Sequence, residues 1–165
     1  MTDPPSRSCE SASACAVTGD VCAADGDCCN GLCVRGVCAG DALHDSAVFQ
    51  RVFPSNCPTG YKVRWGNFEW HADAPSTTSI EFRVAVSDSP SMFSGSLLIG
   101  RTDVNNSNAP PAALRTVNVG DALKDAEIVS APYLRVLMEF TPSADRLTAP
   151  VLFDWNQRYD CLAAE

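Results

Sequence analysis

The two histidines are the residues around which catalysis would have to be built. His44 is followed by Asp45 and Ser46, the residue types of a hydrolytic triad, but sequence neighbours cannot normally converge in triad geometry. We interpret this triplet as a solvated linker. His71 falls at the end of an expected strand, where capping the edge is favoured over proton abstraction. The sequence contains no H-E-x-x-H, G-x-S-x-G or phosphate-cradling glycine loop, so we expect a non-enzymatic protein without a cofactor.

The cysteines give the strongest indication of fold and of location in this chain. Six cysteines lie between Cys15 and Cys38, with the spacing C-x6-C-x5-C-C-x3-C-x4-C. So short a segment cannot enclose an apolar core, and disulfides must replace one. The chain has nine cysteines in all: Cys9, Cys15, Cys22, Cys28, Cys29, Cys33, Cys38, Cys57 and Cys161. Such usage predicts an oxidising location, secreted or at the cell surface.

Metal binding is the competing interpretation of some of these residues. Zinc favours two separated close cysteine pairs, often with histidine, and residues 9–40 contain no histidine. Asp20, Asp25 and Asp27 could gather around Ca²⁺, but their loop lacks the EF-hand pattern, and we expect them to solvate a turn. Asp103 with Asn105 stays open as a Ca²⁺ candidate in a sandwich loop. We expect no resident metal.

Charge and hydropathy limit the partners. The net charge is −8, of which −3 belongs to residues 1–40 (five acids, two Arg) and −5 to residues 41–165 (fifteen acids, ten Lys or Arg). No basic stripe offers a footprint for nucleic acid or an anionic membrane. No apolar run approaches the ~18 residues that a membrane span needs. Residues 1–8 lack the features of a secretory signal, so we expect a truncated or mature form of an exported chain.

Period-two alternation dominates residues 41–165 and predicts an antiparallel β-sandwich or barrel. The clearest strands are 80–86 and 134–140, each with apolar residues on one side only. Further strands are expected at 48–53, 61–65, 67–72, 97–102, 114–119, 128–130 and 151–155. The only helical turns are expected at 121–127, with Asp121 as cap. A Cys57–Cys161 disulfide would enclose this module and pin its last strand beside its first.

The spacing from Cys15 to Cys38, with turns at Asn30-Gly31 and Arg35-Gly36, resembles the inhibitor cystine knot, or knottin framework. Six cysteines permit 15 pairings, and sequence alone cannot choose among them. The resemblance implies the pairs Cys15–Cys29, Cys22–Cys33 and Cys28–Cys38, with a hairpin over 32–38. Cys9 would then be free, displace a knot cysteine or cross-link to another chain.

A second resemblance covers about residues 57–161. The order Cys57-Pro-x-Gly before 61–65, then Phe68-Glu-Trp70, an alternating central strand and a late Tyr133-Leu-Arg-Val resembles jelly-roll β-sandwich modules of the galactose-binding-like type found in bacterial extracellular proteins. That group includes carbohydrate-binding and purely structural modules, so the fold does not decide the function. The expected fold class is all-β: a knottin-like disulfide-rich module at 9–40 and a jelly-roll-like sandwich at 48–165, with a disordered segment at 1–8 and a linker at 41–47.

Charged residues of the expected strands alternate with the apolar set: Lys62, Arg64, Glu69, Glu81, Arg83, Arg135 and Glu139. A cross-strand charge ladder explains them. The alternative is a polar ligand face flanked by aromatic residues, although most of Tyr61, Trp65, Trp70, Trp155 and Tyr159 have the phase of core residues.

These observations favour an adhesive or assembling protein of a matrix or filament, which self-associates or binds other extracellular proteins. A carbohydrate-binding module that uses the charged sheet face or the loop ends is the second hypothesis. A toxin-like or inhibitory knottin carried on a β-sandwich is the third. Asn105-Asn106-Ser107 also fits a glycosylation acceptor.

Overall fold

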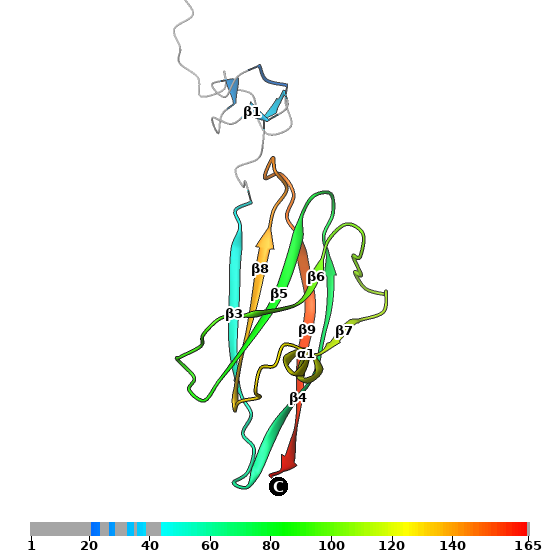
Figure 1. Cartoon of the computed structure of the whole chain (residues 1–165). Coiled ribbons are helices and arrows are strands. Elements are labelled where there is room, and N and C mark those ends of the chain that lie inside the picture. Colours follow the sequence, from blue (N-terminus) through cyan, green and yellow to red (C-terminus); the bar gives the residue numbers. More distant parts are fainter. Residues whose placement is uncertain (1–20, 24–26, 29–32, 35, 39–43, 165) are drawn as a thin grey trace, which may run out of the picture. The chain divides into compact units, whose positions relative to one another are not determined.

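The computed structural model describes residues 21–23, 27–28, 33–34, 36–38 and 44–164 (Figure 1). The chain divides between His44 and Asp45 into two compact units. The expected segment 1–8, the odd Cys9 and the Cys15–Cys29 pair lie outside the described residues. Within the described part of the chain, no helix has the length and apolarity needed to cross a membrane.

Two short antiparallel strands form the framework of the first unit. β1 (Cys33–Val34) pairs with β2 (Val37–Cys38), and Cys33 lies opposite Cys38. Gly36 in the turn has φ of 81°, the positive value that suits glycine at such a tip. The Cys22 N–H donates to the Gly36 carbonyl at 2.9 Å and fastens the preceding segment to the turn.

The second unit is an all-β sandwich of two antiparallel sheets. One sheet has the order β3-β8-β5-β6 and the other has the order β7-β4-β9. The strands are β3 (Ala47–Pro54), β4 (Tyr61–Asp73), β5 (Ser79–Ser87), β6 (Leu97–Thr102), β7 (Arg115–Asn118), β8 (Tyr133–Thr141) and β9 (Val151–Ala163). Only β5 and β6 are neighbours both in the chain and in a sheet, so the other connections pass between sheets, as in jelly-roll-like folds.

The two strands with the clearest alternation lie side by side. β5 pairs with β8 so that Phe82 faces Met138 and Val84 faces Val136, and all four side chains are buried. Their apolar sides meet the aromatic residues of β4 in a single core. Period-two alternation identified these strands because one face of each is buried and the other is half exposed.

The expected strands 61–65 and 67–72 are one strand, β4, interrupted by a bulge. The register with β9 shifts between Trp65 and Phe68, and both of these side chains are fully buried. Gly66 occupies the bulge, where an added Cβ would lie 3.3 Å from the Arg158 carbonyl oxygen. The bulge changes the phase of the apolar pattern by one residue, which is why the sequence suggested two strands.

The structure also differs from the sequence-based expectations around the helix α1 (Val119–Asp125). Asn118 caps it, since its side chain accepts the Asp121 N–H at 3.0 Å, so the prediction of Asp121 as cap is wrong. The expected strand 128–130 is also wrong, because these residues have no strand partner and follow α1 as a loop. The strand expected at 151–155 extends to Ala163 as β9.

Cys57 and Cys161 form a disulfide that closes the second unit. Cys161 lies opposite Val63 of β4, so the last strand, β9, runs beside β4, the second strand of this unit. The expectation that the last strand lies beside the first strand, β3, is therefore wrong. The bond holds the segment between β3 and β4 against the end of the three-stranded sheet.

Candidate functional site

A chain of ion pairs crosses the outer face of the four-stranded sheet. Arg83 contacts Glu81 at 3.0 Å and Glu139 at 3.7 Å. Arg101 contacts Glu81 at 3.6 Å and Asp103 at 3.9 Å. Each of the two arginines therefore lies between two carboxylates, which belong to β5, β8 and the loop after β6. This arrangement is the cross-strand charge ladder that the sequence pattern suggested.

Arg135, also on β8, has different surroundings. Its guanidinium lies 5.0 Å from the centroid of the Phe93 ring and donates to the Gly95 carbonyl at 3.2 Å. Its buried Nε has no hydrogen-bond partner in the structure. Arg135 thus fastens the loop between β5 and β6 to the sheet.

The outer face of the three-stranded sheet carries its own ion pairs. Arg64 contacts Asp160 at 2.9 Å, and Arg158 contacts Glu69 at 3.1 Å, in both cases between β4 and β9. The expected ligand face of Arg64, Glu69, Glu81, Arg83, Arg135 and Glu139 is therefore wrong as one surface. The first two belong to one sheet and the other four to the opposite sheet, because sheet membership depends on topology and not on alternation.

His71 is a structural connector between β4, β9 and the loop before β7. Its Nδ1 lies 3.0 Å from an Asp154 carboxylate oxygen, and its Nε2 lies 2.8 Å from the Ala112 carbonyl oxygen. Both partners only accept hydrogen bonds, so the arrangement is satisfied when both ring nitrogens carry protons. The bond to Ala112 is the main cause of a raised pKa for His71; partial burial opposes the rise, and the Asp154 hydrogen bond and charge add to it.

The stability of the sandwich is expected to fall as pH rises through the raised pKa of His71. Because the folded state binds this proton more tightly than the unfolded state, the stabilisation is complete below about pH 6.5 and is lost above the folded pKa. Urea unfolding at about pH 5.5 and about pH 8.5 measures this difference. The variant H71Q should flatten the profile, and H44Q, at the only other histidine, should retain it. An unchanged profile in H71Q contradicts the assignment.

The loop between β6 and β7 is held by its own side chains. Asn108 is buried, accepts the Ala72 N–H at 3.0 Å, and donates to the Trp70 and Ala113 carbonyls at 3.0 Å each. The Asp103 carboxylate accepts the Asn105 N–H at 2.9 Å in a local turn. The Ca²⁺ candidate Asp103 is therefore engaged in a turn and an ion pair, while Asn105 of the glycosylation motif is exposed.

Within the triplet 44–46, Asp45 has a partner distant in the chain. The Asp45 carboxylate forms an ion pair with the Arg146 guanidinium, 101 residues further along the chain. Asp45 therefore anchors the loop between β8 and β9 instead of orienting a neighbouring base.

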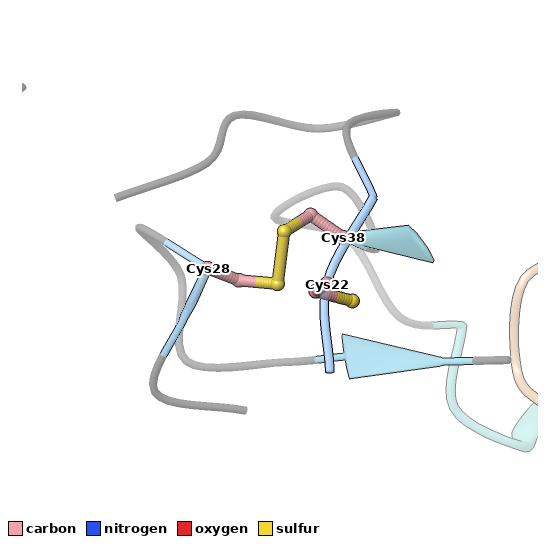
Figure 2. Close-up of side chains that lie close together, drawn as sticks. All are labelled: Cys22, Cys28 and Cys38. Atoms are coloured by element: carbon pink, nitrogen blue, oxygen red, sulfur yellow. A yellow bond between two sulfur atoms is a disulfide. The ribbon is translucent and has the colours of Figure 1, made fainter. Parts of the chain in front are cut away.

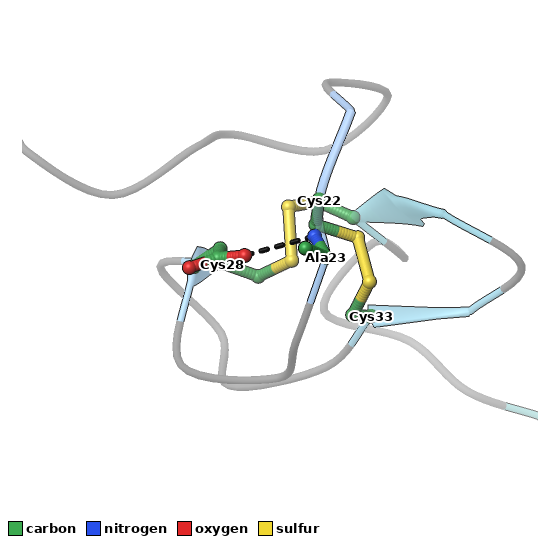
Figure 3. Close-up of a disulfide and its surroundings, with 6 residues drawn as sticks. Cys22, Ala23, Cys28 and Cys33 are labelled. Atoms are coloured by element: carbon green, nitrogen blue, oxygen red, sulfur yellow. Dashed lines mark hydrogen bonds between the residues drawn. A yellow bond between two sulfur atoms is a disulfide. The ribbon is translucent and has the colours of Figure 1, made fainter.

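The cysteines of the first unit form a compact sulfur cluster. Cys22 is bonded to Cys33 and Cys28 to Cys38, two of the three pairs that the knottin resemblance implies (Figures 2 and 3). The sulfurs of Cys22, Cys28 and Cys38 lie within 4.8 Å of one another. Metal ligation needs thiolates, and these sulfurs are used in disulfides.

One of the acidic residues considered for Ca²⁺, Asp27, makes a hydrogen bond next to the disulfides of the first unit. The Asp27 carboxylate accepts the Ala23 N–H at 2.8 Å, the dashed bond in Figure 3. The carboxylate of Asp27 therefore has a local hydrogen-bond partner in the backbone. Asp20 and Asp25 lie outside the described residues.

A groove of about 890 Å³, the α1 groove, lies beside helix α1. Its walls are residues 63–67 of β4, the end of β9 around Tyr159, and the segment from Asn118 to Ser130 that contains α1. Gly120 allows α1 to lie this close to β4. The Cβ of an alanine at position 120 would lie 2.5 Å from the Trp65 carbonyl oxygen, so α1 packs directly on the β4 backbone.

Tyr159 is the aromatic residue that the groove displays. It lies opposite Trp65 in the β4–β9 ladder and has the phase of a core residue, yet its side chain is 37% exposed. The Trp65 indole packs edge-on against its ring, with 5.5 Å between centroids. Sequence reasoning missed the groove, because it depends on the close approach of α1 to β4, which only Gly120 signals.

Comparisons with protein-family models, curated proteins and solved structures find no match to this chain. The disulfides and the sandwich are therefore established by the structure itself, and function must be argued from its surfaces.

Proposed function

We propose that this protein is a secreted or surface-displayed, non-catalytic protein that acts by adhesion or assembly, as a component of a matrix or filament. Disulfides in both units support an oxidising environment. The charged side chains of the outer faces are largely paired with one another, and both nitrogens of His71 have structural partners. A role through surfaces accounts for this arrangement better than catalysis does.

The observation that carries the proposal is the unprotected edge of β3. The sandwich has four edge strands, and three of them are blunted. β7 has four residues, β6 contains a register break, and β9 has two breaks and three charged residues, Asp154, Arg158 and Asp160. β3 runs for eight residues in unbroken register, with Arg51 as its only charge. Such edges pair readily with another strand.

The side chains of β3 favour a second copy of this chain as the partner. Val48 and Phe49 are 67% and 46% exposed. In an antiparallel β3–β3 pair centred on Gln50, Val48 would lie opposite Val52, and Phe49 opposite Arg51. The valines would bury apolar surface, and Arg51, which already lies 5.1 Å from the Phe53 ring, would meet an aromatic face instead of another cation.

Cys9 offers a second way for two copies of the chain to associate, through an intermolecular disulfide. Nine cysteines cannot all pair within one chain, and the three pairs that the knottin resemblance implies, together with Cys57–Cys161, would use eight. Sizing with and without reductant distinguishes a cystine-linked assembly from one made by strand pairing.

Sedimentation of the full chain over a range of concentrations tests the proposal. Species larger than the monomer should form reversibly, and those made through β3 should persist in mild reductant. The variant V48K should shift the protein to monomer, because the pair would then hold two new charges at its edge. V104K is the matched control, since Val104 is an exposed valine in the loop after β6.

Two results would contradict the proposal. A strict monomer with and without reductant excludes both routes. Equal association of V48K and the unaltered chain excludes β3 as the contact.

A further inference from the structure

We propose that β9 takes part in the association of two copies, so that the open side of the sandwich, formed by β3 and β9 together, is the contact surface. The occupant of this side is the same side of a second copy. This inference rests on the proposed function and extends it from one edge strand to both sheets. It depends on the area that β3 offers alone, on ring contacts between β3 and β9, and on exposed apolar side chains along this side.

The edge of β3 is too small to form a lasting contact by itself. In a pair centred on Gln50, residues 47–53 lie beside the same residues of the second copy, a length of ~24 Å at ~3.4 Å per residue. One layer of a sandwich is ~10 Å thick, so this edge covers roughly 240 Å² on each copy. Specific interfaces cover about 800 Å² on each partner. A stable pair therefore needs the second layer, in which the 13-residue β9 is the strand on this side.

Aromatic rings place β9 against β3. The Trp155 ring lies 6.2 Å from the Phe49 ring and 5.6 Å from the Phe53 ring. Trp155 is therefore level with Arg51, which lies between these two residues on β3 and next to Gln50. Two copies paired about Gln50 would bring their Trp155 side chains close to the axis between them. Pairing of β3 thus covers this part of β9 as well.

Exposed apolar side chains continue from β3 onto β9. Val48 and Phe49 of β3 are exposed, and Val151 and Phe153 of β9 are 47% and 51% exposed. Phe153 has no partner residue in the register with β4, so it is the extra residue of a bulge, which turns a side chain away from regular alternation. Apolar surface gathered in this way marks a contact with another protein.

The symmetry of the pair gives Phe153 a partner on the second copy. β3 and β9 run in the same direction (Figure 1), so Phe153, two residues before Trp155, is level with Phe49. In the antiparallel pair, Phe49 lies opposite Arg51 of the second copy, and Trp155 of that copy is level with its Arg51. Phe153 of each copy would therefore meet Trp155 of the other. Two equivalent aromatic contacts about one axis make the surface self-complementary.

The charged residues of β9 do not oppose this contact. Each is paired with a residue of β4 on the outer face of the three-stranded sheet: Asp154 with His71, Arg158 with Glu69, and Asp160 with Arg64. Trp155, by contrast, packs against the core between the sheets. β9 can therefore contact the second copy without leaving a buried charge unpaired.

Sedimentation of F153A over a range of concentrations tests the contribution of β9. We expect the dissociation constant to rise about tenfold or more, because an aromatic contact is lost twice in each pair. The ring is exposed in the single chain, so the variant should remain folded. L98A is the matched control, since Leu98 is 46% exposed on β6, the edge at the other end of the four-stranded sheet. Its association should be unchanged.

Tryptophan fluorescence provides a second measurement of the same contact. Trp65 and Trp70 are buried in the single chain, whereas Trp155 is half-buried. Association of the unaltered chain should therefore reduce quenching by acrylamide, and W155F should abolish this dependence on concentration.

The outcomes separate this inference from the proposed function. Loss of association in both V48K and F153A, but not in L98A, supports the whole side as the contact. If V48K is monomeric while F153A associates as the unaltered chain does, β3 pairing stands and the role of β9 is overturned. Unchanged quenching on association overturns it as well. If V48K associates normally, the contact is not centred on β3, and the proposed function fails together with the inference.

Discussion

Replacing Cys57 and Cys161 together by serine is expected to lower the free energy of unfolding of the sandwich by about 4 to 5 kcal/mol. The disulfide joins residues 104 positions apart and so restricts nearly the whole second unit when it is unfolded. In the chain-entropy description, a loop of about 100 residues corresponds to ~4.7 kcal/mol. Domains are commonly stable by only ~5–15 kcal/mol, so this loss would leave a marginal protein.

Urea unfolding followed by tryptophan fluorescence measures this loss of stability in the second unit, the sandwich. All three tryptophans, Trp65, Trp70 and Trp155, belong to the sandwich. The matched control is the pair C28S and C38S, which removes a disulfide of the first unit. It should leave the tryptophan transition unchanged. A loss below about 1 kcal/mol in the Cys57 and Cys161 double variant would show that this bond contributes little.

Alternation in the sequence predicts strands whose two faces differ. β5 and β8 were found because Phe82 and Met138 lie on fully buried faces and Glu81 and Glu139 lie on half-exposed ones. β4 was divided because the bulge at Gly66 shifts its apolar phase. A bulge is an arrangement with a partner strand, here β9, and such long-range pairing leaves little trace in a local pattern.

The segment around α1 shows a second limit of local reasoning. Residues 128–130 have the composition of a strand, yet Val129 is 85% exposed and no strand lies beside it. The cap was placed at Asp121 instead of Asn118, three residues too late, because β7 runs directly into the helix. A strand needs a partner, and the partners are set by the topology of the whole sandwich.

The topology of the sandwich also decides which candidate site residues share a surface. The sequence showed that Arg64 and Glu81 alternate with apolar residues, but not that they belong to different sheets. It also gave Tyr159 the phase of a core residue. Only the close packing of α1 on Trp65 decides which part of the inner face is covered and which part lines a groove.

The largest effect of a single substitution is expected at Phe68. Its side chain is fully buried, and its ring lies 5.4 Å from Trp70, 5.3 Å from Phe82 and 5.8 Å from Trp155. These rings come from β4, β5 and β9, so Phe68 joins the two sheets at the centre of the core. F68A should lower the free energy of unfolding by about 3–5 kcal/mol, through lost burial and the cavity it leaves.

Thermal unfolding followed by circular dichroism is the suitable measurement, because the substitution alters the surroundings of two tryptophans and hence their fluorescence. F153A removes an equal side chain that is 51% exposed on β9, and it should cost well under about 1 kcal/mol. If the two variants lost similar stability, the aromatic centre would not hold the sheets together. A large difference between them would locate the stability of this sandwich in the contact between its inner faces, which leaves the exposed side chains of β3 and β9 free for binding.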